Sequence, residues 1–543
     1  MLLAVVFACG GAEPTAAPPD PPDMVVLGHS PRLDREVGVV VRGSVIDSVT
    51  TPEEALALAG ETTAVVRGDE VTAGFVDAHG HPSGLAKRRL QLDLTGAPTL
   101  AETLERVRRW AATHDQGWIL GRGWDQNDWS DAPEGGWPTA AALDDVTDRP
   151  TVLRRVDGHA AWLNSTALAA AGIDATTPDP EGGRILRDAR GVPTGVLIDA
   201  AMGLYEVEAP PADVQQRALE EALDELAAAG LTGVHDMGVS DALLARYAAL
   251  DTRGALPIRI WAYLDPDADA TQRLLSEGPW GTDRLRVVGI KAYADGALGS
   301  RGALLTEAYT DEHGHHGLRI TPDARIEELA RRCLAVDAQL AVHAIGDAAV
   351  HETLDAFARA GAPDGGPPLR VEHAQVVRPE DRARFAELGV VASMQPTHAT
   401  SDMPWAPDRL GPDRVGWAYS WQSLRQTGAI LAFGSDFPVE DHRPVFGLWA
   451  ATTRTAPDGT PEGGWQPAQA LDLADAIAGF TEGSAAAAGA QGLGSLQPGM
   501  TADLTVWDVD TDTGPLHRTP TYTILGGDIE YARTMAIDAK SPK

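Results

Sequence analysis

An alternation of short apolar segments with Ala- and Leu-rich segments runs from about Gly74 to about Gly489. The apolar segments have the length of β-strands, and the segments between them have helical spacing, as in DVQQRALEEALDELAAAG followed by LTGVHDMG. Repeated strand–helix units over this length are typical of a closed parallel barrel. We therefore predict an α/β fold built on a (β/α)8 TIM-like barrel over residues 74–489.

The two ends of the chain have a different character. Residues 24–73 and 490–543 contain short β-type runs separated by Gly and Asp turns, such as EVGVVVRGSVIDSV and ADLTVWDVD. Each end is too short to fold alone, so we predict that they pair into one composite β-sandwich domain. Residues of about 87–202 are rich in Trp, Gly and Asp and are predicted to be an insertion over one end of the barrel.

The first residues resemble the end of a bacterial lipoprotein signal peptide. MLLAVVFACGG places Cys9 after an apolar run, and a Pro- and Ala-rich tether continues to residue 23. No basic segment precedes the apolar run, which a start codon chosen too far downstream would explain. The segment at residues 1–23 thus predicts a lipid anchor at Cys9 and a location in the cell envelope. A disordered leader on a cytoplasmic protein is the alternative.

Charge and cysteine content exclude several classes of partner and site. The formal net charge of -34 argues against nucleic acid as a partner, because such binding needs clustered Lys and Arg. No apolar run reaches the roughly 18 residues of a spanning helix, so membrane contact is expected only through the anchor at Cys9. The 2 cysteines, Cys9 and Cys333, exclude a thiolate cluster, and any metal site must use nitrogen and oxygen ligands.

Five of the predicted strands end in a residue that can bind a metal ion. These strand ends are GFVDAHGH (His79, His81), VVGIKAYADG (Lys291), LAVHAIGD (His343), RVEHAQ (His373) and ILAFGSDFP (Asp436). In a parallel barrel the carboxyl ends of all strands converge on one face, so residues far apart in the sequence can meet there.

The residue types at these positions are unusual for a packed interior. His79 and His81 are two positions apart on a strand, so their side chains share one face and can chelate one ion. Lys291 lies in an apolar strand, where a buried charge is unfavourable unless it is neutralised or paired. Asp436, close to Phe433 and Phe437, presents the same difficulty. A single histidine at a strand end is more often structural, but the joint pattern favours a metal site.

Beyond these positions, longer motifs carry a family resemblance. They are GRGWDQNDW, RRVDGHAAWLNSTAL, GGRILRDARGVPTGVLID, KAYADGALGSRGALL, GSDFPVE and GSLQPGMTADLTVWD. With the strand-end residues, they make the chain similar to the amidohydrolase superfamily and to its YtcJ-like branch (amidohydrolase family three), which includes N-substituted formamide deformylases. The resemblance implies a metal-dependent hydrolase barrel with a composite β-sandwich.

The resemblance also implies a set of metal ligands. One ion would be held by His79, His81 and Asp436, and a second by His343 and His373. Lys291 resembles a bridging lysine that carbon dioxide converts to a carbamate. Zinc is the expected metal, with one or two ions per chain, because imidazole and carboxylate ligands suit it.

The expected chemistry follows from this set. The metal would lower the pKa of a bound water and polarise the substrate carbonyl, while Asp436 would act as general base and pass the proton to the leaving nitrogen. We therefore expect hydrolysis of a non-peptide C–N bond in a small-molecule amide, N-acyl or N-formyl amine. An ester or lactone hydrolase of the same barrel and a non-catalytic binding or regulatory protein at the cell surface are the alternatives. Either a monomer or a homodimer is compatible with the sequence.

Several further residues are candidates for substrate binding. The insertion and the segment after Lys291 contain polar and aromatic residues that could line the mouth of the pocket. They are Trp124, Asp125, Gln126, Asp157, His159, Asp295 and Arg301. For Trp124, packing in the core is an alternative of equal weight. For Asp157, the alternative of equal weight is an ion pair with a neighbouring arginine.

Overall fold

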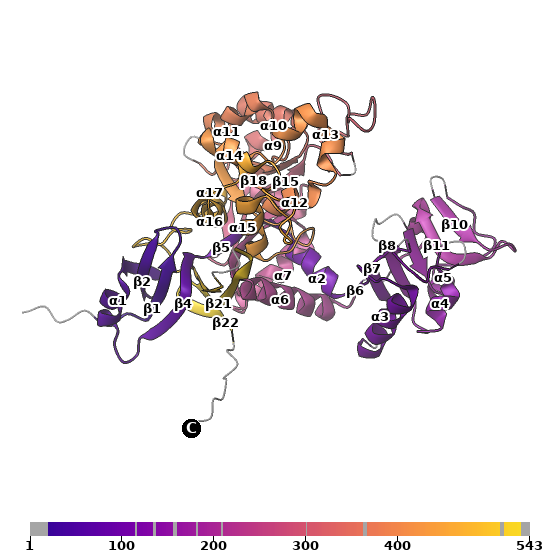
Figure 1. Cartoon of the computed structure of the whole chain (residues 1–543), viewed down its shortest axis with the longest axis horizontal. Helices are drawn as coiled ribbons and strands as arrows, with labels where there is room; N and C mark the ends of the chain where they lie inside the picture. The colour runs from indigo at the N-terminus through magenta and orange to yellow at the C-terminus, as the bar shows by residue number, and fades with distance from the viewer. Residues whose placement is uncertain are drawn as a thin grey trace, which may run out of the picture.

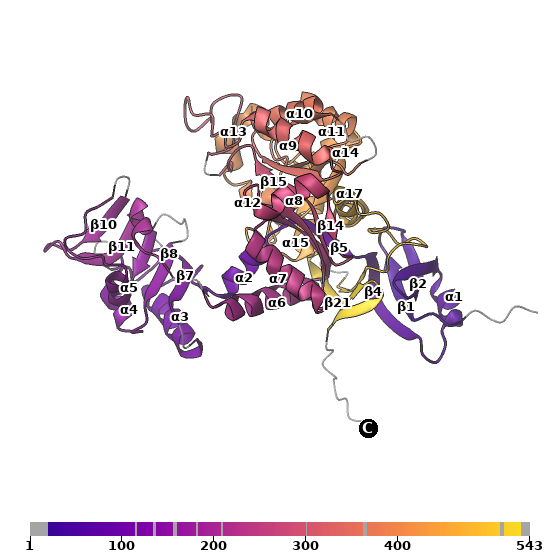
Figure 2. The ribbon, with the colours of Figure 1, turned by 180° about the vertical axis from the view of Figure 1, so that it is seen from behind.

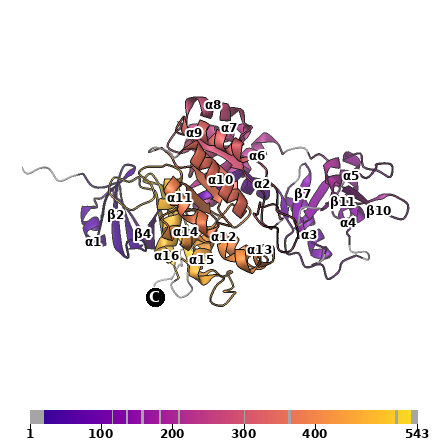
Figure 3. The same cartoon turned by 90° about the horizontal axis from the view of Figure 1, so that it is seen from above.

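The computed structural model describes residues 20–114, 117–126, 128–133, 137–155, 160–180, 183–207, 210–299, 301–361, 366–510 and 515–533. The strands of these segments form three separate sheets, which belong to a barrel, a β-domain and an insertion. The β-domain and the insertion lie on opposite sides of the barrel in all three views (Figures 1, 2 and 3). In the part of the chain that is described, no helix combines the length and apolar character needed to cross a bilayer.

The barrel is a parallel sheet in which the first and last strands come together. Its strands, in spatial order, are β5 (Phe75–Gly80), β12 (Leu231–Val239), β13 (Arg259–Leu264), β15 (Leu285–Tyr293), β16 (Gln339–Ala344), β17 (Arg370–His373), β18 (Val391–Met394) and β19 (Ile430–Phe433). The backbone N–H of Asp436 donates to the carbonyl of His79 at 2.7 Å, and that of His81 donates to Phe437 at 2.9 Å. These two hydrogen bonds join the ends of β5 and β19 and complete the barrel.

Helices cover the outside of the barrel (Figure 1). Helix α6 packs against the strands through one apolar face, on which Leu219, Leu223 and Leu226 recur at helical spacing. All three are buried in the same core cluster as barrel-strand residues such as Ile260. The helices after α6 (Ala212–Ala228) are α7 (Asp241–Thr252), α8 (Asp269–Glu277), α9 (Asp323–Leu334), α10 (Asp347–Ala360), α11 (Arg382–Leu388), α12 (Pro396–Asp402), α13 (Ala406–Arg414), α14 (Trp421–Gln426), α15 (Pro444–Thr453), α16 (Leu473–Phe480) and α17 (Glu482–Ala487).

The β-domain combines strands from both ends of the chain in one seven-stranded sheet. Its strands are, in spatial order, β22 (Asp528–Ala532), β21 (Arg518–Leu525), β20 (Leu504–Val509), β4 (Ala64–Ala73), β1 (Met24–Ser30), β2 (Arg35–Arg42) and β3 (Val45–Thr50), and α1 (Pro52–Leu58) packs beside β2. The buried guanidinium of Arg259 on β13 donates to both carboxylate oxygens of Asp503, at 2.7 and 2.8 Å, and ties this domain to the barrel. The predicted fold class, a TIM-like barrel with a domain built from both chain ends, is confirmed.

The insertion forms a third sheet with its own helices. Its strands are, in spatial order, β10 (Gly183–Arg187), β11 (Pro193–Asp199), β9 (Ala160–Leu163), β8 (Thr151–Arg155), β7 (Ile119–Trp124) and β6 (Leu92–Asp93), with α3 (Leu100–Thr113), α4 (Ala140–Asp144) and α5 (Ser165–Ala170). It follows α2 (Pro82–Arg89) and lies beside the barrel (Figures 1 and 3). The insertion buries apolar side chains in cores of its own. Its predicted position over one end of the barrel stays a prediction.

Candidate metal centre

The structure brings together all six residues that the strand ends single out. They come from β5, the residue that follows it, β15, β16, β17 and the turn after β19, and all of them line one cavity of about 420 Å³. These residues are His79, His81, Lys291, His343, His373 and Asp436. The six strand-end residues therefore form one cluster in the folded protein.

His79 is oriented by a carboxylate on β17. Its Nδ1 lies 2.7 Å from Oε2 of Glu372, which is completely buried and paired with Arg370 at 2.8 Å. Burial alone would raise the pKa of Glu372, but the charge of Arg370 and the hydrogen bond with His79 hold it well below its usual range. Because an ionised carboxylate only accepts hydrogen bonds, Nδ1 of His79 carries the proton and Nε2 keeps its lone pair.

The lone pair of His79 Nε2 faces Lys291 and Asp436. Nε2 lies 3.3 Å from Nζ of Lys291 and 3.7 Å from Oδ1 of Asp436. Burial and the nearby Lys291 charge lower the pKa of His79 to about 4, so its imidazole is neutral at neutral pH. Burial likewise lowers the pKa of Lys291 to about 8, so a larger fraction of its amine is neutral than in water at the same pH. A neutral imidazole is the form that binds a metal ion.

Asp436 also contacts His81. Its Oδ1 lies 3.0 Å from Nε2 of His81. Burial would raise the pKa of Asp436, but the hydrogen bond with His81 and the neighbouring imidazoles hold the pKa well below its usual range. Asp436 is therefore a carboxylate at neutral pH, and His79, His81 and Asp436 offer donor atoms within 4.8 Å of one another.

A close approach of two backbone segments positions Asp436. Asp77 on β5 accepts hydrogen bonds from the backbone of His79 at 3.0 Å and from the hydroxyl of Ser435 at 2.7 Å. A Cβ on Gly434 would lie only 2.5 Å from Oδ1 of Asp77 and from the backbone nitrogen of His79. Asp436 itself adopts a φ of 58°, a left-handed conformation that the packed turn maintains.

His343 and His373 form the second part of the cluster. Their ring centroids are 4.5 Å apart. His373 Nδ1 lies 2.8 Å from Oε1 of Gln395, while His343 Nε2 lies 3.4 Å from the carbonyl of Gly296 and 3.7 Å from Oδ1 of Asp295. Burial lowers the pKa of both imidazoles, that of His343 to about 3. Both rings are thus neutral and each is oriented through one nitrogen, which leaves the other nitrogen available.

The predicted substrate residues of the insertion occupy other positions. Trp124 is fully buried, donates its indole N–H to the carbonyl of Leu153 at 2.7 Å, and packs against Trp129 and Trp162. Asp125 and Gln126 both bind Arg155, at 2.6 and 2.9 Å. These three residues are absent from the described lining of the cavity around the cluster. The tryptophan-rich motif supports the core of the insertion, as the packing alternative predicts.

Of the remaining predicted substrate residues, Asp295 and Arg301 are described. Asp157 and His159 lie outside the described residues. Asp295 is buried behind His343 and accepts backbone N–H groups from Leu304, Ile345 and Gly346 at 2.8 to 3.0 Å. Arg301 pairs with Asp311 at 2.9 Å. Asp295 therefore holds the backbone segments that follow β15 and β16, and Arg301 belongs to an ion pair outside the cavity.

His398 is a member of the cluster that the strand-end criterion does not select. It lies on α12, past the end of β18, and its Nε2 is 3.9 Å from Oδ2 of Asp436. The cavity is completed by aromatic, apolar and acidic side chains, among them Tyr293, Trp405, Asp402 and Glu440. The sequence signal for His398 is its position directly after a barrel strand, in MQPTH, because such loops also face the carboxyl end of the barrel.

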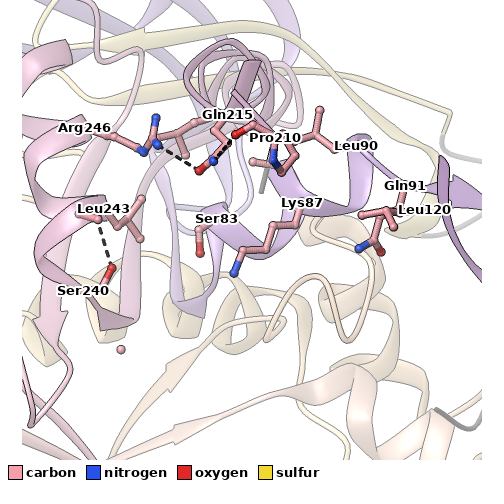
Figure 4. A pocket seen from close by; sticks show the side chains of 14 residues that line it. Ser83, Lys87, Leu90, Gln91, Leu120, Pro210, Gln215, Ser240, Leu243 and Arg246 are labelled. Carbon is pink, nitrogen blue, oxygen red and sulfur yellow. Dashed lines mark hydrogen bonds between the residues drawn. The ribbon is translucent and has the colours of Figure 1, made fainter. Parts of the chain in front are cut away.

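A separate cavity lies between α2, α6 and α7 (Figure 4). It has a volume of about 530 Å³, and its wall includes Arg246, which donates to Gln215 at 3.0 Å. Its described wall includes Lys87 and Ser83 but no histidine, cysteine or carboxylate. This cavity therefore lacks a donor set for a metal ion, in contrast to the cavity at the strand ends.

The side chains of the cluster fit a divalent metal ion on their own chemistry. The imidazoles of His79, His343 and His373 are neutral and the Asp436 carboxylate is ionised, which are the protonation states of metal ligands. Glu372 and Gln395 hold the outer nitrogens of His79 and His373, as hydrogen-bonding partners behind metal ligands do. The Nε2 atom of His398 is buried without a hydrogen-bonding partner among the described residues.

Comparison with known proteins agrees with this geometry. The chain matches the model of the "Amidohydrolase family" over residues 67–531. It is 33% identical over 522 residues to the protein YtcJ of Bacillus subtilis (strain 168), covering 92% of this chain and 97% of that protein. It is 29% identical over 530 residues to an N-substituted formamide deformylase of Arthrobacter pascens, covering 91% of this chain and 95% of that enzyme.

A solved structure of a metal-dependent hydrolase is also similar to this chain. A crystal structure of an uncharacterized metal-dependent hydrolase from Pyrococcus horikoshii OT3 aligns with a TM-score of 0.75 at 27% sequence identity, over 94% of this chain and 99% of that one. The family match spans the barrel, the insertion and the part of the β-domain from β4 and β20 to β22, including every residue of the cluster. The chain therefore belongs to the amidohydrolase family.

Proposed function

We propose that the protein is a metal-dependent hydrolase that cleaves a non-peptide C–N bond in an amide, N-acyl amine or N-formyl amine. The observation that carries this proposal is the set of imidazoles and one ionised carboxylate around one cavity, with donor atoms of His79, His81 and Asp436 within 4.8 Å of one another. The similarity to an N-substituted formamide deformylase favours the C–N bond over an ester or lactone.

A zinc ion in this donor set supplies Lewis acidity toward the substrate carbonyl and activates water. In this proposal His79, His81 and Asp436 hold one ion, and His343 and His373 contribute to a second. The orienting contacts of Glu372 and Gln395 support these assignments, because they keep the imidazoles in one tautomer and one direction.

Lys291 is proposed to react with carbon dioxide. Its neutral amine attacks the carbon of CO2, an N–C bond forms, and the amine loses a proton, so that a carbamate anion replaces a buried ammonium. The lowered pKa of Lys291, about 8, supports this step because a larger fraction of neutral amine is present near neutral pH. The carbamate would also lie beside His79, because Nζ of Lys291 is 3.3 Å from Nε2 of His79.

Asp436 is proposed to move the proton. Its carboxylate borders the cavity and is ionised at neutral pH, so it can accept a proton from the attacking water and transfer it to the leaving nitrogen. The contact of Oδ1 with His81 fixes the direction of the carboxylate at the border of the cavity. Protonation of the nitrogen lets the amine depart as a neutral molecule.

The test compares matched substrates. N-formyl and N-acyl arylalkylamines are assayed beside the esters in which oxygen replaces nitrogen, with release of amine or alcohol as the readout. Asp436→Asn should reduce kcat by at least about 100-fold. Asp441→Asn is the control on the same turn, because its carboxylate pairs with Arg443 at 2.6 Å and is not among the residues lining this cavity.

Four outcomes separate the alternatives. Turnover of amides that falls in Asp436→Asn and persists in Asp441→Asn supports the proposal. Turnover of esters alone would make the protein an ester or lactone hydrolase of the same barrel. Unchanged metal content and turnover in Asp436→Asn would refute the role of Asp436, and zinc-loaded protein that is inert toward all pairs would favour a binding or regulatory protein.

We also propose that Cys9 carries a lipid anchor and that the protein lies in the cell envelope. Cys9 lies outside the described residues, so this proposal rests on the sequence of the first 23 residues. Palmitate labelling of the expressed chain and of Cys9→Ala tests it. Label in the parent but not in the variant is expected, and an unlabelled parent would mean that the leader is not a lipoprotein signal.

A further inference from the structure

His398 has a buried ring nitrogen without a hydrogen-bonding partner. Its side chain is 13% exposed, and no described group lies within hydrogen-bonding distance of Nε2. The nearest charged atom is Oδ2 of Asp436 at 3.9 Å. Buried ring nitrogens are normally paired with a protein group or water, so an unpaired one that borders a cavity points to a ligand at that position.

The imidazole of His373 lies beside that of His398 and is nearly parallel to it. The rings of His373 and His398 are nearly parallel, at 14°, with centroids 6.0 Å apart. Gln395, immediately before α12, binds Nδ1 of His373 through its Oε1, and His398 lies one turn further on the same helix. One short segment therefore orients both imidazoles toward Asp436.

Asp436 presents its two oxygens to two different groups of donors. Oδ1 faces His81 at 3.0 Å and His79 at 3.7 Å, whereas Oδ2 faces His398. One donor atom from each of His373, His398 and Asp436 lies within 4.8 Å of the other two. A separation of 3.9 Å is too long for a hydrogen bond, but two ligands that are each about 2.0–2.2 Å from a shared zinc ion can lie that far apart.

We propose that His398 is a metal ligand, which binds a second ion through Nε2 together with His373 and Asp436. The carboxylate of Asp436 then connects this ion with the one at His79 and His81. The inference rests on the proposed metal-dependent function. It adds a ligand on α12, the helix that follows β18, to the ligands at the strand ends. A histidine that contacts only the substrate is the competing explanation.

Zinc binding by the full-length chain tests the inference without reference to catalysis. Metal-stripped protein is titrated with zinc in the presence of a competing chelator, and bound zinc is measured by plasma mass spectrometry. The variants are His398→Ala and His398→Gln, with His81→Ala as a probe of the first donor set. His313→Ala is the control, because His313 is an exposed histidine of a loop outside the cavity. Cobalt absorption spectra report the ligands of each ion independently.

We expect the parent and His313→Ala to bind about two zinc ions per chain and both His398 variants to bind about one. The ion that remains should keep its affinity, and the cobalt spectrum should lose only the component of the second ion. His81→Ala should weaken the other ion. His398→Gln keeps a polar side chain, so it supplies the answer if His398→Ala does not fold.

Three results would overturn the inference. Zinc stoichiometry and affinity that are the same in the parent and in both His398 variants would mean that His398 binds no metal. A parent that binds a single ion, removed by His81→Ala, would mean that the second donor set stays empty while the proposed function stands. A parent that binds no zinc at all would overturn the proposed metal-dependent function together with the inference.

Discussion

Replacement of Glu372 by glutamine tests whether the buried partner behind His79 supports both the fold and the metal site. Glu372 is completely buried, accepts from His79 at 2.7 Å, and pairs with Arg370 at 2.8 Å. Removing one partner of a buried ion pair costs about 3–5 kcal/mol of stability. Arg370 keeps its hydrogen bonds to Tyr263 and Ser393, at 2.7 and 3.0 Å, so we expect the lower end of that range for the metal-free protein, about 3 kcal/mol.

The same substitution should weaken zinc binding by about 10- to 100-fold, because Glu372 orients a proposed ligand. Its effect on stability also depends on pH. The folded pKa of Glu372 is depressed, so its contribution is present above the unfolded pKa and is lost as the pH falls through the folded value. The difference between parent and Glu372→Gln should therefore narrow below about pH 4.

Urea denaturation of metal-free protein at several pH values and zinc titration against a chelator measure the two effects. Glu277→Gln is the matched control, because Glu277 forms an exposed helical pair with Arg273 at 2.9 Å, which contributes about 0.5 kcal/mol or less. If Glu372→Gln denatures at the same urea concentration as Glu277→Gln and binds zinc like the parent, the argument for a supporting ion pair behind His79 is refuted.

Three further predictions concern other parts of the molecule. Lys291→Ala should bind zinc more weakly and regain activity with added acetate or propionate; parent-like zinc binding with no gain from these acids would argue against the carbamate. Trp124→Ala should destabilise the insertion by about 3–5 kcal/mol, because Trp124 is buried against Trp129 and Trp162, and should leave zinc affinity unchanged in the same titration. The metal-free protein should lose stability as the pH falls from about 6.5 to about 4, because unfolded His79 takes up a proton in this range and buried His79 does not; a denaturation midpoint that is independent of pH there would contradict it.

The sequence predicts the barrel and six members of the cluster because both depend on regular features. The strand–helix alternation determines that all strands run in one direction, and parallel strands place their carboxyl ends on one face. His79, Lys291 and Asp436 can therefore be assigned to one site without knowing any distance. The two ends of the chain are also predictable, because their turn-rich β-type runs cannot form a sheet separately.

Other parts of the site depend on contacts that leave little trace in a single sequence. Glu372 reads as an ordinary polar residue beside His373, although it is the buried partner of His79. His398 lies on a helix rather than at a strand end, so the strand-end criterion does not select it. Trp124 is assigned to the pocket mouth because aromatic residues suit binding sites, yet the same side chain also suits a core, and packing against other tryptophans decides between them.

Closure of the barrel and assembly of the metal centre depend on the same few contacts. Asp77 binds the backbone of His79 and the hydroxyl of Ser435, and the carbonyl of His79 accepts from the backbone of Asp436. The missing side chain of Gly434 lets these segments approach, because a Cβ there would lie 2.5 Å from Asp77 and from His79. The donor set of His79 and Asp436 therefore forms only when the last barrel strand meets the first, so a barrel left open at this seam lacks the geometry that the proposed chemistry requires.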